Sequence, residues 1–425
     1  MTTPTDIAAY IWSTLAVRAL GLIDPADADR RLEATLDALG RMERDHGFFF
    51  NRYEVETRSR SPIIGDRTRT SRPFLSSVDN AWLAAALMMV RNVHPLLRDR
   101  ADALLAPMDF PFFYVPFDPA NPIARPGQFH CGYFTDDHTF AAFYGMLNTE
   151  PRIISYIAIA RGQVPPEHYY HLYRTLPTDR GRQNQVPKGE VRSYLGVPVF
   201  EGHYEYRGLD IVPSWGGSMF EALMVPLFVP EEQWAPRSWG INHTLYVRAQ
   251  IEQGLKVRHY GFWGFSPASK PEGGYETYGV EALGTKAEGY RTFENALRSK
   301  SNGGSPTDQA REGVVTPHAS FLALRFARCE ALANLRALIK AFPIFDLQGF
   351  HDSVNVATGE VSPCVLALDQ GMILASIANA LSDDALRHAF RDGLIEARIH
   401  PLIAPEEFTA GDHRRRSSPP DVITQ

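Results

Sequence analysis

The stretch from Ser76 to Val93 reads SSVDNAWLAAALMMVRNV and predicts a helix rich in Ala, Leu and Met, with Asp79 in its first turn. Helical patterns recur along most of the chain as consecutive pairs with short links. Several begin with a capping residue or with proline in the first turn, such as Thr316-Pro317. The other predicted helices are Ile7–Leu20, Ala26–Arg41, Leu96–Ala106, Glu150–Ala160, Pro166–Leu176, Ser218–Phe228, Asn242–Gly254, Pro317–Leu332, Asn334–Phe342, Val365–Leu381 and Asp383–Arg391.

About a dozen helices in antiparallel pairs predict an all-α fold, an (α/α)6 toroid barrel whose function lies on the connecting loops. Long strand patterns are scarce, so we expect only small β-hairpins on the active-site face, from Gly47–Tyr53, Val197–Tyr206 and Tyr260–Phe265. The absence of a fixed sequence period argues against a regular helical solenoid. We expect one catalytic domain over residues 1–410 and a disordered tail over residues 411–425, which is charged and rich in Pro and Ser.

The composition is that of an ordinary globular protein. The chain has 425 residues, of which 44% are apolar and 22% charged, with a net charge of -6. The scattered Lys and Arg residues argue against nucleic-acid binding, and the three cysteines predict neither a disulfide framework nor a zinc site. No apolar run predicts a membrane span. Without a recognisable leader we expect a cytoplasmic protein, or a secreted or periplasmic one if a leader was removed; the oligomeric state stays open.

Polar and aromatic residues interrupt several helix starts and nearby loops where core patterning alone would not place them. Taken singly, each has a structural explanation as a helix cap, a dipole partner or a buried hydrogen-bonded residue. Taken together, they suggest a ligand-facing cleft. The residues concerned are Asp79 with Trp82, Glu150 with Arg152, Trp215 with Glu221, the Gly- and Tyr-rich segment containing Trp263, Tyr275 and Glu276, and finally His318 and Asp369.

Other catalytic signatures are missing from the sequence. There is no HExxH, P-loop, dinucleotide-binding or G-x-S-x-G motif. Asp136-Asp137-His138 resembles part of a metal site, but it has no further spaced ligands, so a solvated loop is the better interpretation and no metal or cofactor is predicted. Carboxylates with aromatic residues on loops are the equipment of glycoside hydrolysis, which needs an acid, a second carboxylate and platforms for sugar rings.

The segments also resemble a known family. In order along the chain they are Gly47–Tyr53, Ser77–Asn80, Asn148–Arg152, Ser214–Glu221 and Leu368–Gly371. Together they resemble the glucoamylase-like family, which includes the endo-β-1,2-glucanases of glycoside hydrolase family 144 and the transferring domain of cyclic β-1,2-glucan synthases. The resemblance implies an (α/α)6 barrel and a β-linked glucan, either oligosaccharide or polysaccharide, as the substrate.

Carried over by motif, the resemblance makes Glu150 the general acid, Asp79 a carboxylate of the first glucose subsites and Asp369 the residue that orients or activates water. Trp215 and Glu221 would line the same cleft. The family's transferring domains tend to read Trp-Gly-Ile-Ser-Glu where this chain has Trp263-Gly264-Phe265-Ser266-Pro267. Proline in place of a carboxylate favours an inverting hydrolase over a retaining transglycosylase, unless Glu272 or Glu276 supplies the carboxylate.

Two rival functions stay open at this point. One is a transglycosylase or phosphorylase-like enzyme of the same fold that excludes water from its site. The other is a carbohydrate-binding protein with a decayed site, which gains support if Glu150, Asp79 and Asp369 do not converge on one cleft. Residues 194–210, which contain Glu201 and Glu205, look like an insertion relative to the family and could reshape the cleft.

Overall fold

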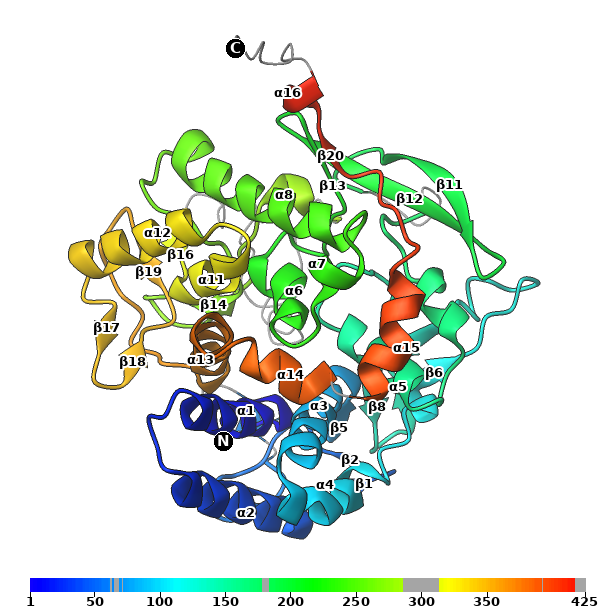
Figure 1. The fold of residues 1–425 in the computed structure, drawn as a ribbon, viewed down its shortest axis with the longest axis vertical. Coiled ribbons are helices and arrows are strands. Elements are labelled where there is room, and N and C mark those ends of the chain that lie inside the picture. The colour runs from blue at the N-terminus through cyan, green and yellow to red at the C-terminus, as the bar shows by residue number, and fades with distance from the viewer. Residues whose placement is uncertain are drawn as a thin grey trace, which may run out of the picture.

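The computed structural model describes residues 1–61, 63–64, 69–70, 72–177, 183–285, 313–391 and 393–416. Within these residues, six helices form a closed ring (Figure 1). Each packs on the next, α1 on α3, α3 on α5, α6 on α11, α11 on α13 and α13 on α1. Arg152 closes the gap between α5 and α6 by donating to the carbonyl oxygens of Glu221 and Ala222. The helices are α1 (Pro4–Ala19), α3 (Ser77–Val93), α5 (Arg152–Ala160), α6 (Met219–Leu223), α11 (Pro317–Leu322) and α13 (Ala367–Leu381).

A second layer of helices surrounds this ring, as the pairing of the sequence patterns predicted. They are α2 (Pro25–Arg41) on α1, α4 (Arg98–Leu105) on α3, α8 (Trp239–Glu252) on α6, α12 (Arg328–Ala341) on α11 and α15 (Leu394–Ile403) on α5. Another helix, α14 (Ala385–Arg391), follows α13 and also packs on α1 and α3. The burial pattern explains the two layers. Helix α3 is buried along nearly its whole length, whereas α2 buries only a narrow stripe that includes Leu32, Leu36 and Leu39.

The all-α expectation is incomplete, because the protein also contains a substantial sheet. Four antiparallel strands form it in the order β11 (Lys188–Tyr194), β12 (Val197–Tyr206), β13 (Leu209–Ile211) and β20 (Gly411–Asp412). This sheet occupies most of residues 194–210. The other described sheets are small, with two or three strands each.

Those small sheets combine β1 (Arg44–Asp45) with β2 (Phe48–Phe49), β3 (Ile63–Ile64) with β4 (Arg69–Thr70), β5 (Phe74–Ser76) with β8 (Gly132–Phe134) and β9 (Thr139–Phe140), β6 (Tyr114–Val115) with β7 (Gln128–His130) and β10 (Phe143–Tyr144), β14 (Ala268–Ser269) with β15 (Tyr275–Glu276), β16 (Val314–Val315) with β19 (Val354–Asn355), and β17 (Phe345–Asp346) with β18 (Gly349–Phe350). Residues 260–265, which were predicted to form part of a hairpin, contain no strand.

Two predicted helices are corrected. Residues 166–176 form only a 3-10 turn, Pro166–His171, because the buried His168 ring bonds to Ser155 Oγ and the Gly127 carbonyl. The predicted helix over residues 317–332 breaks at Ala327, whose φ of -152° is not helical. The start of the tail that was expected to be disordered is also ordered. Strand β20 pairs with β13, and the Arg414 guanidinium donates to Glu252 at 2.9 Å; residues 417–425 lie outside the described part of the chain.

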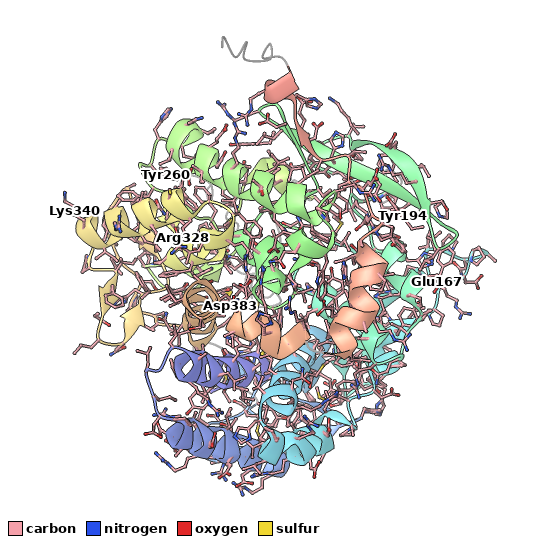
Figure 2. The ribbon with its side chains drawn as sticks, in the orientation of Figure 1. Glu167, Tyr194, Tyr260, Arg328, Lys340 and Asp383 are labelled. Atoms are coloured by element: carbon pink, nitrogen blue, oxygen red, sulfur yellow. The ribbon has the colours of Figure 1, made fainter. Side chains whose placement is uncertain are left out.

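Apolar side chains fill the space between the two helical layers. The rings of Trp12, Trp82 and Phe228 lie within 6.0 Å of one another, measured between ring centroids, and join α1 to α3. Long charged side chains point outward, for example Lys340 on α12 (Figure 2). None of the described helices combines the length and the apolar character needed to cross a bilayer.

Candidate active site

Each of the six ring helices carries an ionisable residue within its first turn or just before it. Those residues are Asp6, Asp79, Glu150, Glu221, His318 and Asp369. The five carboxyl groups influence one another around the ring, and His318 lies 3.4 Å from Asp369, so the six residues face a common region. Glu221 and Asp79 raise the pKa of Glu150, while Asp6 raises the pKa of both Asp79 and Asp369. The N-terminal ends of the ring helices therefore form one acidic site that unites Glu150, Asp79 and Asp369.

Glu150 lies two residues before Arg152, the first residue of α5, and is 8% exposed. Burial raises the pKa of Glu150 to about 8, and the charges of Glu221 and Asp79 add to the effect. Among the described residues, no other side chain makes a hydrogen bond to this carboxyl group. Glu150 is therefore protonated at neutral pH and has its proton available, which are the two properties that a general acid needs.

Asp79 is held in place by the neighbouring helix. Thr5 Oγ1 on α1 donates a hydrogen bond to Asp79 Oδ1, while Ser76 caps α3 by accepting from the Asp79 N–H at 3.2 Å. Burial raises the pKa of Asp79, with a further contribution from Asp6, and Arg52 opposes this rise. Asp79 is thus a first-turn residue of α3 and a member of the acidic site, but it is not the helix cap, because Ser76 holds that position.

Asp369 forms a compact group with His318 and Asp352. His318 Nδ1 lies 3.4 Å from Asp369 Oδ1, and one potential ligand atom from each of the three residues lies within 4.8 Å of the others. Burial raises the pKa of Asp369 to about 7 and lowers that of His318 to about 4. Burial also raises the pKa of Asp352 well above its ordinary value, with Asp369 adding to the rise. The Ser269 N–H donates to Asp352, which links this group to β14.

The side chains of Glu221 and Arg152 make more hydrogen bonds within the protein than the sequence suggested. Glu221 completes a capping box with Ser218, and its carboxylate also accepts from Ser214 Oγ and the Gly216 N–H. The Arg152 guanidinium is buried and donates to both carboxylate oxygens of Glu231 and to three backbone carbonyls. Arg152 was predicted to bind substrate, but its donors are already used, so it is a structural residue. Glu221 acts on the site through its charge.

The predicted aromatic platforms divide into two groups. Trp82 and Trp263 are each 1% exposed and belong to the core, so their assignment to substrate binding is corrected. Their large apolar rings pack between helices, as most large apolar rings do. Trp215, Tyr275 and Glu276 are partly exposed, and their role in lining a cleft stays a prediction.

Three residues of the site were not predicted, namely Asp6, Arg52 and Asp352. Asp6 had a detectable signal, because Thr3 and Asp6 form a capping box with the spacing of Ser218 and Glu221. Arg52 lies in the Gly47–Tyr53 motif but was not assigned a role. Asp352 follows strand β18 in a loop, where no local pattern distinguishes a buried aspartate from an exposed one.

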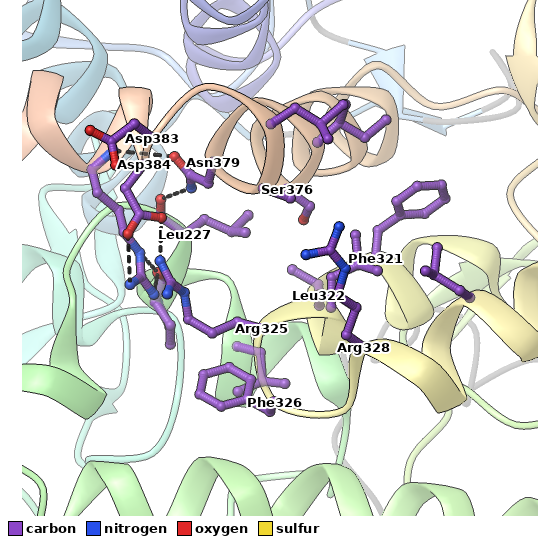
Figure 3. Close-up of a pocket in the computed structure, with 18 residues that line it drawn as sticks. Leu227, Phe321, Leu322, Arg325, Phe326, Arg328, Ser376, Asn379, Asp383 and Asp384 are labelled. Atoms are coloured by element: carbon purple, nitrogen blue, oxygen red, sulfur yellow. Dashed lines mark hydrogen bonds and ion pairs between the residues drawn. The ribbon is translucent and has the colours of Figure 1, made fainter.

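A separate cavity of about 500 Å³ lies at the opposite, C-terminal ends of α6, α11 and α13 (Figure 3). Its apolar lining includes Leu227 and Phe321. Its lining also contains ion-paired groups, since Asp384 pairs with Arg325 and the lining residue Arg387 pairs with Glu232. This cavity lacks the protonated carboxyl group and the crowded acids of the other end, so the candidate active site is the one at the helix N-termini.

Comparison with known proteins finds two matching family models and a related synthase. A family model described as "Putative glucoamylase" matches residues 148–393, more than half of the chain, and a model for a protein of unknown function matches residues 1–110. The chain is 29% identical over 337 residues to the cyclic β-(1,2)-glucan synthase NdvB of Rhizobium meliloti strain 1021. That match covers 75% of this chain and 10% of the synthase, so the chain spans about a tenth of its relative's length.

Solved structures share the fold. An endo-β-1,2-glucanase from Chitinophaga pinensis, in complex with sophorotriose and glucose, has a TM-score of 0.66 at 14% identity over 95% of this chain and 87% of that one. An endo-β-1,2-glucanase from Talaromyces funiculosus, in complex with sophorose, has a TM-score of 0.65 at 12% identity over 97% of this chain and 82% of that one. These matches confirm the helical toroid.

Proposed function

The chain belongs to the glucoamylase-like family, and from that premise we propose that it is an inverting glycoside hydrolase of β-1,2-linked glucan or its oligosaccharides. The observation that carries the proposal is Glu150, a buried carboxyl group that holds its proton at neutral pH beside other acids. The β-1,2 linkage is inferred from the relatives, which are a synthase and two glucanases of this glucan. We also infer that the ring is the inner layer of an (α/α)6 barrel and that residues 1–410 form one catalytic domain.

In the proposed mechanism, Glu150 protonates the leaving glycosidic oxygen and Asp369 activates a water molecule on the opposite face of the sugar ring. Asp79 binds the sugar between them. The charge of Asp79 raises the pKa of Glu150, and the charge of Asp6 raises the pKa of both Asp79 and Asp369. These influences support a position of Asp79 between the acid and the base. Partly exposed Trp215 and Tyr275 offer surfaces for sugar rings.

Inversion is supported by the segment that departs from the transferring domains. Ser266 is fully buried and its hydroxyl accepts from the Phe220 N–H, and Pro267 follows it with no carboxylate to act as a nucleophile. An inverting pair of carboxyls leaves room for water, at a separation of roughly 6.5–9.5 Å.

Digestion of β-1,2-, β-1,3-, β-1,4- and α-linked glucans tests the proposal, with NMR following the anomer first released. We expect the wild type to cleave β-1,2-glucan with inversion, and Glu150→Gln and Asp369→Asn to lose this activity. The exposed Glu33→Gln variant serves as the matched control and should keep full activity. Cleavage of none of these glucans would overturn the substrate assignment. Retention of the anomer would overturn the inverting mechanism but not hydrolysis, whereas products longer than the substrate would replace the hydrolase by a transglycosylase.

A further inference from the structure

The group formed by His318, Asp352 and Asp369 is deeply buried, yet some of its polar atoms lack hydrogen-bond partners among the described residues. The three residues are 2%, 1% and 5% exposed, respectively. Both ring nitrogens of His318 are buried and have no hydrogen-bond partner among the described residues. Asp352 Oδ1 and Asp369 Oδ2 are also buried, and the two carboxyl groups have only a hydrogen bond to each other and the one from the Ser269 N–H to Asp352. Leaving a buried imidazole without any partner is costly, so this crowded group requires an explanation.

The charge balance of this group also requires an explanation. Among the described residues, no lysine or arginine forms an ion pair with Asp352 or Asp369, and His318, 3.4 Å from Asp369, is the basic side chain that lies beside them. Other buried acids in this protein do have cations, for example Glu231 with Arg152 and Glu406 with Arg174. Buried carboxylates in proteins are paired with cations or coordinate metals, and this group has no protein cation.

The spacing of the atoms fits a bound metal ion better than a hydrogen bond. The 3.4 Å between His318 Nδ1 and Asp369 Oδ1 is longer than an ordinary N–H···O bond. Two ligands that share a tetrahedral zinc ion, each about 2.0–2.2 Å from it, stand roughly 3.3–3.6 Å apart. The third ligand, from Asp352, lies within the same 4.8 Å limit.

We propose that His318, Asp352 and Asp369 form a binding site for one divalent transition-metal cation, of the class that accepts mixed imidazole and carboxylate ligands, such as Zn²⁺ or Mn²⁺. One cation satisfies an imidazole nitrogen and the two carboxylates together and balances their charge. It joins α11 and α13 to the loop after β18. A ligated Asp369 stays ionised, and its second oxygen remains an acceptor for water.

The test begins with wild-type protein that has been purified without a polyhistidine tag and without chelator, and its metal content is measured by inductively coupled plasma mass spectrometry. The same protein, after dialysis against chelator, is then titrated with ZnCl2 and with MnCl2 by calorimetry, and its thermal midpoint is followed. His318→Gln and Asp352→Asn remove single ligands with little change in side-chain size. The matched control is His94→Gln, because His94 is also a buried histidine beside an aspartate, Asp29, but Arg18 already pairs with that aspartate.

We expect the wild type to bind one equivalent of cation and to gain thermal stability from it. His318→Gln and Asp352→Asn should weaken binding at least about tenfold, and His94→Gln should leave it unchanged. A wild type that contains no metal and binds neither cation at millimolar concentration overturns the proposal, with a proton shared between Asp352 and Asp369 as the alternative. Equal binding by wild type and His318→Gln also overturns it. Neither measurement uses a glucan, so failure of the hydrolase proposal would not affect the result.

Discussion

Replacing the proposed acid, Glu150→Gln, should make the protein more stable at neutral pH while it abolishes catalysis. The folded-state pKa of Glu150 is about 8, against 4.5 for an ordinary glutamate. Because the folded pKa is the higher one, folding requires proton uptake between these values, and stability falls as the pH rises from about 4.5 to 8. At pH 7 this linkage costs about 3 kcal/mol. Glutamine has nearly the same shape and never ionises, so the variant should avoid this cost.

Thermal unfolding of both proteins at pH 4 and pH 7 measures the effect. With an unfolding entropy of about 2.1 cal/mol/K per residue, 3 kcal/mol corresponds to roughly 3–4 °C for a chain of this length. The midpoint should rise by that amount at pH 7 and by close to nothing at pH 4, where Glu150 is protonated in both the folded and the unfolded states. Activity on the glucan should fall by about 100-fold or more, the usual contribution of a general acid.

Two outcomes would refute this reasoning. A variant that is less stable than the wild type at pH 7 would mean that Glu150 is ionised and stabilised in the folded protein. A gain of equal size at both pH values would mean that the substitution improves packing and does not remove a charge. The exposed Glu33→Gln variant controls for the loss of one net negative charge and should change neither midpoint.

Three further predictions concern the same network. In protein freed of metal by chelator, the pH profile of kcat/KM should be a narrow bell, rising near pH 7 as Asp369 ionises and falling near pH 8 as Glu150 loses its proton; a flat profile over this range would contradict both roles. In Asp79→Asn the falling limb of this profile should move to lower pH, because a charge that raises the pKa of Glu150 is removed. A falling limb at unchanged pH would show that Asp79 does not influence the pKa of Glu150. Arg152→Met leaves Glu231 buried without its cation and should lower the free energy of unfolding in urea by about 3–5 kcal/mol, whereas a loss below about 1 kcal/mol would show that the pair is dispensable.

The sequence carried enough information to predict the ring and most of the acids that it presents. Capping residues followed by an acid in the first turn mark the starts of α3 and α6, and this signal is local. The same signal is present at Asp6, but the helix was predicted to begin only at Ile7, so the capping box before it was missed. Acidic site residues at helix starts can therefore be found from a single sequence once the ring is expected.

The other features depended on packing that no local pattern reports. Trp82 follows Asp79 by one helical turn and was assigned to the cleft, but its ring turns toward Trp12 and Phe228 in the core. Asp352 reaches the site from a loop, held by a backbone bond from Ser269, which is 83 positions away in sequence. The four-stranded sheet was underestimated because its last strand, β20, comes from residues near the end of the chain that resembled a disordered tail.

Glu150 and Glu231 show how two residues in one fold acquire opposite protonation states. Both are fully buried, yet the pKa of Glu150 is raised to about 8 and that of Glu231 is lowered to about 2. A helix N-terminus favours an ionised carboxylate by up to about 2 kcal/mol, which is less than the roughly 5 kcal/mol that corresponds to the shift of Glu150. Burial and repulsion by neighbouring acids therefore outweigh the helix at Glu150. Arg152 lies two residues further on and its charge lowers the pKa of Glu150, but its guanidinium bonds to Glu231, and the opposing effect of burial on Glu150 is larger.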